Sequence, residues 1–197
     1  MTEIIVNGGF ETGSLDPWKL WLLKGVKARV IHPADVEPVE GSYVCEQTCL
    51  MEVSGGYEAR GIYQKAPCNS NKFVFKYDVC TPKKISGNAK LKVMLMFYDA
   101  AGEAITWKEW THSLSVLNER EWFVWRHEIT LDTFARSVRV SFGFTETKGS
   151  VPLRIYLDNI SLKEKREMAF SDFVLLGGLG LGGYYLYKKY FKSTTPP

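Results

Sequence analysis

The sequence predicts an all-β domain with the architecture of a β-sandwich, followed by an apolar C-terminal tail. Three observations lead to this fold class: strand-length runs that alternate apolar and polar residues, turn-forming residues between the runs, and no convincing helical periodicity before residue 165. The aromatic content of 14%, with six Trp, suits a sandwich core and also a ligand surface built from flat rings. At 197 residues the chain is long enough to bury one good core.

The middle of the chain is expected to form strands over residues 42–53, 61–65, 72–80, 90–98, 122–131 and 137–145. In three of them every second residue is apolar and is expected in the core: Phe73, Phe75, Tyr77 and Val79, then Leu91, Val93, Leu95 and Phe97, then Val138, Val140, Phe142 and Phe144. Residues 99–102, Asp-Ala-Ala-Gly, predict a turn between two strands. Many short strands joined by such turns are typical of a sandwich or jelly roll.

Two segments bracket this strand-rich region. Residues 7–18, Asn-Gly-Gly-Phe-Glu-Thr-Gly-Ser-Leu-Asp-Pro-Trp, are typical of a strand that enters a glycine-rich turn and then buries Trp18. Residues 154–162, Arg-Ile-Tyr-Leu-Asp-Asn-Ile-Ser-Leu, predict a closing strand. Its two faces are expected to carry Ile155, Leu157 and Asn159 on one side and Tyr156, Asp158 and Ile160 on the other.

Together the two segments resemble the opening and closing strands of the carbohydrate-binding-module jelly rolls, which are galactose-binding-domain-like β-sandwiches, over about residues 3–163. The resemblance implies a jelly roll that binds glycans without catalysis. It also implies a structural Ca²⁺ ion where the first and last strands meet, held by Glu11, Asp158 and backbone carbonyls. The alternative is that both carboxylates accept hydrogen bonds from turn amides.

The Trp residues divide into expected core and expected ligand positions. Trp18 and Trp125 fit the core by their surroundings, and Trp122 occupies a position where the resembling domains usually have a structural Trp. Other rings are candidates for stacking on a sugar: Trp21, Trp107, Trp110, Tyr57 and Tyr63. The segment Trp107–Trp110 is expected in a loop, where binding residues often lie. The alternative is that these rings cap the sandwich or contact a neighbouring subunit.

The charges are nearly balanced, with 25 basic and 22 acidic residues and a net charge of +3. There is no basic stripe, so nucleic acid is not an expected partner. The polar faces of the predicted strands carry Lys76, Asp78, Lys92, Arg126, Glu128 and Arg139. They predict either a polar sugar-binding groove or a solvated face with ion pairs.

The reactive side chains do not indicate an enzyme. The three histidines have no nucleophile or metal-ligand spacing around them, and no carboxylate pair is marked as a glycosidase centre. The cysteines, at positions 45, 49, 68 and 80, also lack metal-ligand spacing. A hairpin that turns at residues 54–57 would place Cys45 opposite Cys68 and allow a disulfide, with buried thiols as the alternative.

Composition changes abruptly after the closing strand. The predicted organisation is a jelly roll over 1–163, a charged hinge over 164–169, a hydrophobic and helical segment over 170–192 and a polar end over 193–197. As a helix, the uncharged stretch from Phe173 to Tyr187 would span about 22 Å at about 1.5 Å per residue, against roughly 30 Å for a bilayer core. Neighbouring Lys and Tyr side chains suit a membrane interface. The segment is therefore expected to anchor the chain in a membrane or to dock on a neighbouring subunit of an oligomeric assembly.

The first residues run straight into the domain, without the basic region or cleavage site of an export signal. A virion protein needs no such signal, because it is assembled inside its host. The sequence therefore favours a virion structural protein that displays a glycan-binding jelly roll on its surface and is anchored by its tail. The alternatives are a purely structural assembly subunit with no glycan ligand and an accessory domain of a carbohydrate-active enzyme.

Overall fold

The computed structural model describes residues 1–21, 25–53 and 60–165. They belong to one compact unit, Met1–Lys165. The expected anchor over 170–192, most of the charged hinge and the polar end lie outside the described residues. Within the described part of the chain, no helix has the length and apolar character that a membrane span requires.

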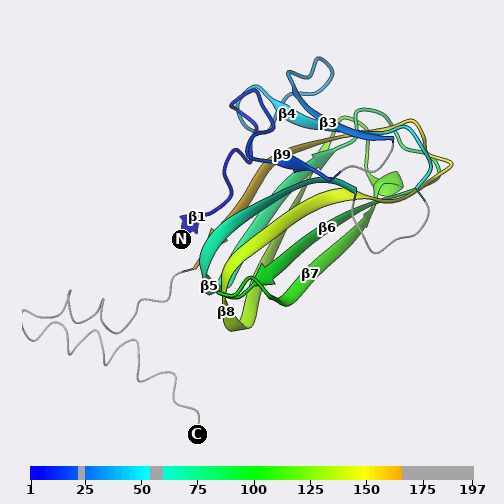
Figure 1. Cartoon of the computed structure of the whole chain (residues 1–197). Helices are drawn as coiled ribbons and strands as arrows, with labels where there is room; N and C mark the ends of the chain where they lie inside the picture. Colours follow the sequence, from blue (N-terminus) through cyan, green and yellow to red (C-terminus); the bar gives the residue numbers. More distant parts are fainter. Residues whose placement is uncertain (22–24, 54–59, 166–197) are drawn as a thin grey trace, which may run out of the picture. The chain divides into compact units, whose positions relative to one another are not determined.

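Antiparallel β-strands make up most of the described unit (Figure 1). The elements are β1 (Thr2–Glu3), β2 (Lys19–Leu20), β3 (Val26–Ile31), β4 (Val44–Cys49), β5 (Arg60–Cys80), β6 (Asn88–Tyr98), β7 (Ala104–Ser113), the 3₁₀ turn η1 (Leu114–Val116), β8 (Trp122–Lys148) and β9 (Leu153–Glu164). The prediction of an all-β fold is confirmed. Strands β3 and β7 were not predicted.

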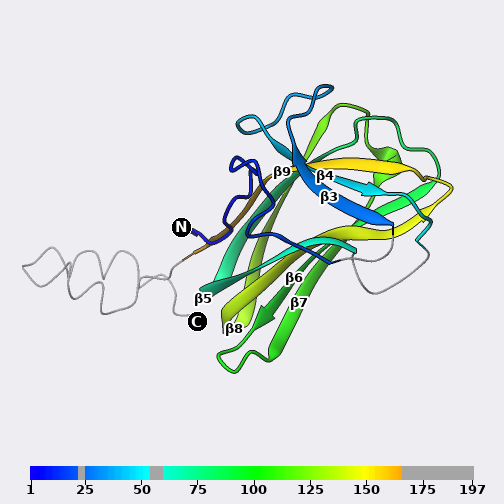
Figure 2. The ribbon, with the colours of Figure 1, turned by 45° about the horizontal axis from the view of Figure 1, so that its top comes forward.

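The strands form one hydrogen-bonded series, β3-β4-β9-β5-β8-β6-β7, which folds over on itself into two layers (Figures 1 and 2). The first layer, the β3 sheet, contains β3, β4, β9 and the halves of β5 and β8 that pair over residues 72–80 and 122–130. The second layer, the β7 sheet, contains β2, β6, β7 and the other halves of β5 and β8, over 60–67 and 137–148. Two antiparallel layers that pack face to face are a β-sandwich, as predicted.

Strands β5 and β8 are long because each crosses from one layer to the other. The pairing register between them shifts between Pro67 and Ser70 and again between Ser70 and Lys72. Such irregularities bend a strand and increase its twist, so the same two strands can serve both layers. The four strands predicted over 61–65, 72–80, 122–131 and 137–145 are thus halves of two continuous strands.

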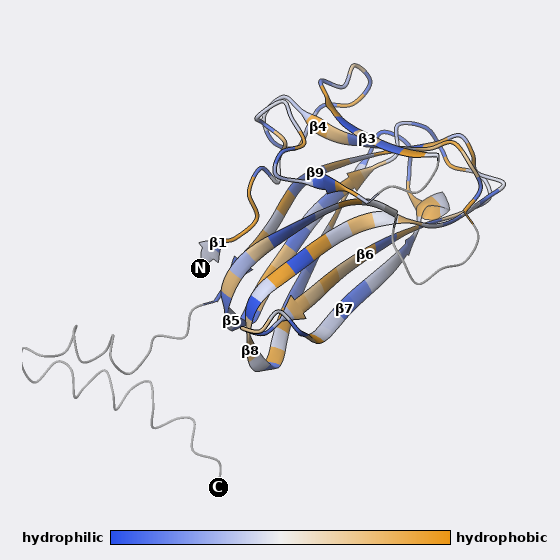
Figure 3. Cartoon of the chain, in the orientation of Figure 1, coloured by the Kyte–Doolittle hydropathy of each residue, from blue (hydrophilic) through white to orange (hydrophobic). Residues whose placement is uncertain are grey.

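The inner faces of the two layers form a common apolar core. The alternating core positions predicted for β5, β6 and β8 are all at most 1% exposed, which confirms that prediction. Figure 3 shows apolar and polar residues alternating along β5 and β8. The predicted turn after β6 is also present, with the Asp99 N–H donating to the Glu103 carbonyl oxygen at 3.0 Å.

The closing strand β9 departs from its predicted alternation at one residue. Asn159 has a φ of +49°, and the register between β9 and β5 shifts between Lys76 and Asp78. An extra residue of this kind is a β-bulge, and it moves the following side chains to the other face. Ile160 is therefore in the core with Leu157, at 3% exposure, and its predicted place on the opposite face was wrong.

The expected core Trp residues have different outcomes. Trp18 is 4% exposed, and its Nε1 donates to the Asn7 carbonyl oxygen at 3.1 Å, so its predicted burial is confirmed. Trp125 packs against the core, as expected. Trp122 belongs instead to a small apolar cluster outside the main core, and its Nε1 donates to the Glu37 carbonyl oxygen at 2.7 Å. The predicted core role of Trp122 was wrong, because its side chain fastens the loop that precedes β4.

Among the described residues, β4 and β5 do not pair as the predicted hairpin requires, and the turn expected at 54–57 lies outside these residues. Strand β4 pairs with β3 and β9, so Cys45 lies beside Leu157 and not beside Cys68. Cys45 and Cys68 are not joined by a disulfide. Burial raises the pKa of the Cys68 thiol to about 11, which keeps it protonated at neutral pH.

Candidate functional site

Strand β7 separates two Trp residues that the sequence placed together. The prediction of a loop over Trp107–Trp110 was wrong, because these residues lie within a ten-residue strand. Residues three positions apart in a strand point to opposite faces. Trp107 is 61% exposed on the outer face of the β7 sheet. Trp110 packs against the core with its ring 4.0 Å from that of His127, so it shares no surface with Trp107.

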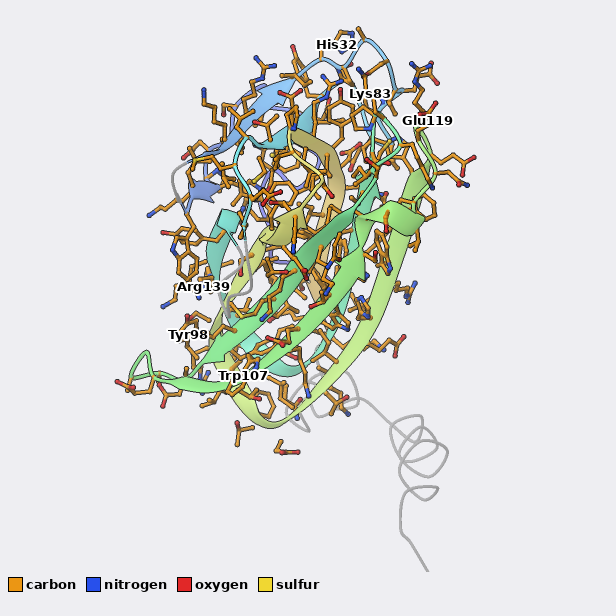
Figure 4. All side chains as sticks on the ribbon, turned by 90° about the vertical axis from the view of Figure 1, so that its right-hand side faces the viewer. His32, Lys83, Tyr98, Trp107, Glu119 and Arg139 are labelled. Atoms are coloured by element: carbon orange, nitrogen blue, oxygen red, sulfur yellow. The ribbon has the colours of Figure 1, made fainter. Side chains whose placement is uncertain are left out.

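The outer surface of the β7 sheet gathers aromatic, sulfur-containing and charged side chains. We call this surface the β7 face, and its residues include Lys19, Trp21, Tyr63, Lys65, Lys90, Lys92, Met94, Met96, Tyr98, Trp107, Glu109, Arg139, Ser141 and Glu146. Residues paired across neighbouring strands point to the same face. One such row crosses four strands, from Lys65 through Arg139 and Met96 to Trp107. In Figure 4, Arg139, Tyr98 and Trp107 lie along one side of the molecule.

The middle of the β7 face is less accessible than its edge. Lys92 is 6% exposed and Met94 is 7% exposed, whereas Trp107 stands out at the edge strand. Lys92 Nζ lies 2.9 Å from Glu109 Oε2, so the charge of the buried ammonium is compensated. A chain molecule laid across the strands along this row would meet the side chains of Lys65, Arg139 and Met96 and then the exposed ring of Trp107.

Cations and aromatic rings are in direct contact on the β7 face. The Arg139 guanidinium lies 4.5 Å from the ring centre of Trp21 and 5.9 Å from that of Tyr63. These two rings meet edge to face, with centres 6.1 Å apart. Lys65 Nζ lies 4.2 Å from the ring centre of Tyr98. The negative face of each ring stabilises the cation above it, which fixes where the positive charges sit.

The structure brings together only part of the predicted ligand set. The predicted stacking residues on the β7 face are Trp21, Tyr63 and Trp107. Tyr57 lies outside the described residues. Tyr98 and Met96 were missed, although the alternation over 90–98 already placed them opposite the core. The pattern therefore contained the signal, but the sequence did not show which strands would lie beside β6.

The charged residues expected on one polar face divide between the two layers. Lys92 and Arg139 lie on the β7 face, and the others lie on the outer surface of the β3 sheet: Lys76, Asp78, Arg126 and Glu128. The side chains of Arg126 and Glu128 are each 63% exposed, and Arg126 Nη2 lies 3.7 Å from Glu128 Oε1. The solvated-face alternative thus describes Arg126 and Glu128 but not the fully buried Asp78, and the groove alternative concerns the β7 face alone.

Glu11 and Asp158 both hold the loop before β4. The Glu11 carboxylate accepts hydrogen bonds from the backbone N–H groups of Ser42 and Tyr43, the latter at 2.9 Å. Asp158 Oδ2 accepts from two backbone N–H groups, those of residues 39–40, at 2.7 and 3.1 Å. No three acidic, His or Cys side chains among the described residues are grouped to hold a metal ion. The turn-amide arrangement is therefore present, and Ca²⁺ at these carboxylates stays a prediction.

The carboxyl group of Asp158 is destabilised in its charged form. Burial raises its pKa to about 6, backbone hydrogen bonds oppose this rise, and the nearby Asp78 adds to it. Burial also raises the pKa of Asp78, whose Oδ1 has no hydrogen-bond partner among the described residues. The two buried acids therefore store an electrostatic penalty at neutral pH.

Two of the histidines have a structural explanation. The buried Tyr77 hydroxyl lies 2.6 Å from His112 Nε2 and 3.4 Å from His127 Nε2. His127 stacks on Trp110, and His112 lies 4.2 Å from Trp125. Burial lowers the pKa of His112 to about 4 and also lowers that of His127, so both rings are neutral at pH 7. These rings pack between β7, which carries Trp110 and His112, and the first half of β8, which carries Trp125 and His127.

The fold is shared with several solved structures, although no protein-family model and no curated protein matches the sequence. The enzymatically active domain of bacteriophage CBA120 tailspike protein 4 has a TM-score of 0.58 at 12% identity, over 81% of this chain and 21% of that chain. A family 16 carbohydrate-binding module has a TM-score of 0.51 at 21% identity, over 82% of this chain and 99% of that module. The xylan-binding CBM22-1 domain from Paenibacillus barcinonensis has a TM-score of 0.53 at 12% identity, over 81% of this chain and 94% of that domain.

The described unit therefore has the fold of the carbohydrate-binding-module jelly rolls, as the opening and closing segments of the sequence implied. The chain spans nearly the whole length of the two solved binding modules, 99% and 94%, but only 21% of the tailspike chain. At these identities it is the fold that is shared, so the function has to be argued from the residues of the β7 face.

Proposed function

We propose that this jelly roll is a non-catalytic module that binds a polysaccharide on the β7 face. The observation that carries the proposal is Trp107, a large ring that is 61% exposed on a strand whose other face is packed on the core. A ring that the core does not use is available for the C–H face of a sugar. The fold likeness to two carbohydrate-binding modules supports the proposal.

The β7 face offers both kinds of contact that a sugar needs. The C–H patches of the sugar would pack on Trp107 and on the Met96 side chain beside it in the row. Its hydroxyl groups would find an acceptor in the Glu109 carboxylate, which is 45% exposed, and donors in Lys65 and Arg139. An extended polysaccharide that crosses the strands would meet these groups in succession, which favours a chain over a single sugar.

Affinity electrophoresis of the full-length protein in gels that contain single polysaccharides tests this proposal. We expect retardation by at least one polysaccharide, and we expect Trp107→Ala to weaken that binding about tenfold or more, which corresponds to about 1.4 kcal/mol. Phe134→Ala is the matched control, since Phe134 is also an exposed ring, at 51%, but is not part of the β7 face. Absence of binding to every polysaccharide tried, on gels and on a glycan array, would contradict the proposal.

We also propose that Ca²⁺ stabilises the junction between the two ends of the domain at Glu11 and Asp158. Both carboxylates accept hydrogen bonds from the loop before β4, and carboxylate and carbonyl oxygens are the ligands that Ca²⁺ prefers. A chelator should lower the melting temperature of the native protein and should leave that of Asp158→Ala unchanged. A native melting curve that excess chelator does not move would count decisively against bound Ca²⁺.

We propose finally that the module is displayed on a virion surface, or is membrane-associated, through residues 170–192. The fold likeness to a bacteriophage tailspike domain and the uncharged sequence from Phe173 to Tyr187 support this placement. The competing function is an assembly subunit with no glycan ligand, in which Trp107 would be buried between subunits. Oxidative footprinting of the native assembly distinguishes them: modification of Trp107 supports display, and protection that is lost on dissociation supports the structural subunit.

A further inference from the structure

The β7 face carries an excess of positive charge. Its charged residues are Lys19, Lys65, Lys90, Lys92, Arg139, Glu109 and Glu146. Each carboxylate is engaged by a lysine: Glu109 by Lys92 at 2.9 Å and Glu146 by Lys90 at 2.7 Å. Lys65 and Arg139 make no ion pair with any of the described residues. These two cations, like Lys19, are therefore left without a compensating anion among the described residues.

Arg139 is the more constrained of these two cations. Its guanidinium is held against the rings of Trp21 and Tyr63, and its Nε atom is buried with no acceptor among the described residues. A buried donor of a charged group that lacks an acceptor is costly, so the guanidinium is only partly compensated and this position favours an anionic ligand. The planar guanidinium presents a fork of N–H groups that matches the two oxygens of a carboxylate.

Lys65 adds a second cationic side chain on the strand next to that of Arg139. The two residues are register partners on the neighbouring strands β5 and β8. Directly opposite residues on one face are about 5 Å apart at Cβ, and like charges in such a pair destabilise the sheet. An anion that contacts both side chains would remove this repulsion. The pair lowers the stability of the sheet and favours the binding of an anionic ligand.

The rings next to these cations are less available to a neutral sugar. Arg139 lies over Trp21, and the Lys65 ammonium lies over Tyr98, whereas a sugar would need those ring faces for its own C–H groups. None of the described cations lies over the ring of Trp107, which is the exposed Trp of this face. The β7 face thus offers one sugar platform and, on the same row, a pair of positive charges.

We infer that the polysaccharide bound by the β7 face is acidic: carboxylates of its uronic acid residues pair with Arg139 and Lys65 while a neighbouring sugar ring packs on Trp107. This inference rests on the proposed function and narrows its substrate class. Uronate carboxylates supply the anion that Arg139 and Lys65 lack, and the row from Lys65 to Trp107 sets the direction in which the chain crosses the strands.

Pairs of polysaccharides that differ only in charge test the inference. The full-length protein is titrated at physiological salt with polygalacturonate, alginate, hyaluronan and glucuronoxylan, and with the carboxyl-reduced form of each, which keeps the linkages and loses the charge. We expect at least one acidic member to bind about tenfold or more tightly than its reduced form. Arg139→Gln should remove most of that difference. Arg126→Gln, which removes an exposed Arg from the outer surface of the β3 sheet, should leave it unchanged.

The possible outcomes separate this inference from the proposed function. Equal binding of an acidic polymer and its reduced form, or binding of neutral polysaccharides alone, overturns the inference and leaves polysaccharide binding intact. Failure of all polymers to bind contradicts the proposed function itself. Equal binding of dextran sulfate overturns the inference as well, because it would show general attraction of anions. If Arg139→Gln is unfolded by its melting curve, the exposed Lys65→Gln replaces it, and unchanged selectivity in that variant contradicts the inference.

Discussion

At the scale of single residues, buried titratable groups push the stability of the domain in opposite directions in acid. The raised pKa of Asp158, about 6, means that the folded state holds a proton more tightly than the unfolded state, so this group's contribution is full below about pH 4 and is lost as pH rises through 6. The lowered pKa of His112, about 4, has the reverse effect: its contribution is full above about pH 6.5 and is lost as pH falls through 4.

These signs predict how two substitutions change the pH profile of stability. Asp158→Asn removes a term that falls with pH, so between pH 4 and 6 the free energy of unfolding should rise more steeply with pH, by at most about 1.4 kcal/mol per pH unit. His112→Gln removes the opposing term and should make the profile fall more steeply over the same window. Urea unfolding at several pH values measures both slopes. Parallel profiles for the two variants and the native protein would contradict this account.

Gly41 is a residue whose backbone and surroundings both exclude a side chain. It has a φ of +62°, and an added Cβ would lie 2.0 Å from Cδ of Glu11. Gly102 has a φ of +85° but nothing within 4 Å of such an atom. Gly102→Ala should therefore cost only the backbone strain of about 1 kcal/mol, and Gly41→Ala about 1–3 kcal/mol more, because the Glu11 hydrogen bonds are displaced. Equal midpoints of urea unfolding for the two variants would show that Glu11 does not hold this loop.

At the scale of elements, β7 shows what one strand can do with two faces. Trp110→Ala should lower the free energy of unfolding by about 2–4 kcal/mol, because its ring packs on His127 and on Phe75. Trp107→Ala should change it by less than about 0.5 kcal/mol, because that ring is exposed. Chemical denaturation of the two variants measures the difference. A large loss of stability in Trp107→Ala would mean that the ring is part of the fold and not available to a ligand.

The elements that the sequence predicted are those whose alternation is complete. The inner positions of β6, of residues 73–79 in β5 and of residues 138–144 in β8 are all buried, so their period of two is visible. Strand β7 lies at the edge of its sheet, and its three consecutive exposed residues, 107–109, interrupt the alternation. The bulge at Asn159 is set by pairing with β5, a partner that no local pattern around residue 159 could reveal.

At the scale of the whole molecule, the candidate site depends on strands that are distant in the sequence. Trp21, Tyr63 and Arg139 each stood out as an aromatic or charged residue, but their contact requires β2, β5 and β8 to be neighbours in one exact register. The composition of the β7 face was therefore partly predictable, and its pairing of cations with rings was not. Trp110 illustrates the same point, since only the strand assignment of β7 places it on the core side.

The structure also predicts where the domain can be cut. Its last strand is closed by contacts near Lys165: the Lys165 N–H donates to the Lys72 carbonyl oxygen at 2.8 Å, and the Ser70 hydroxyl donates to the Lys165 carbonyl oxygen at 3.0 Å. Leu162, in the same strand, is fully buried in the core. The contacts that complete the sandwich are therefore all made within Met1–Lys165.

A chain that ends at residue 165 should accordingly fold cooperatively, with a melting temperature within about 2 °C of the full-length protein measured in detergent, because it keeps every core contact described for this unit. A chain that ends at residue 160 loses Leu162 and the pairing of β9 with β1, and it should melt at least about 5 °C lower, since a fully buried Leu contributes about 2–5 kcal/mol. Circular dichroism of the three chains measures this. If the chain of 165 residues melts as low as the shorter one, the C-terminal residues contribute to the fold itself.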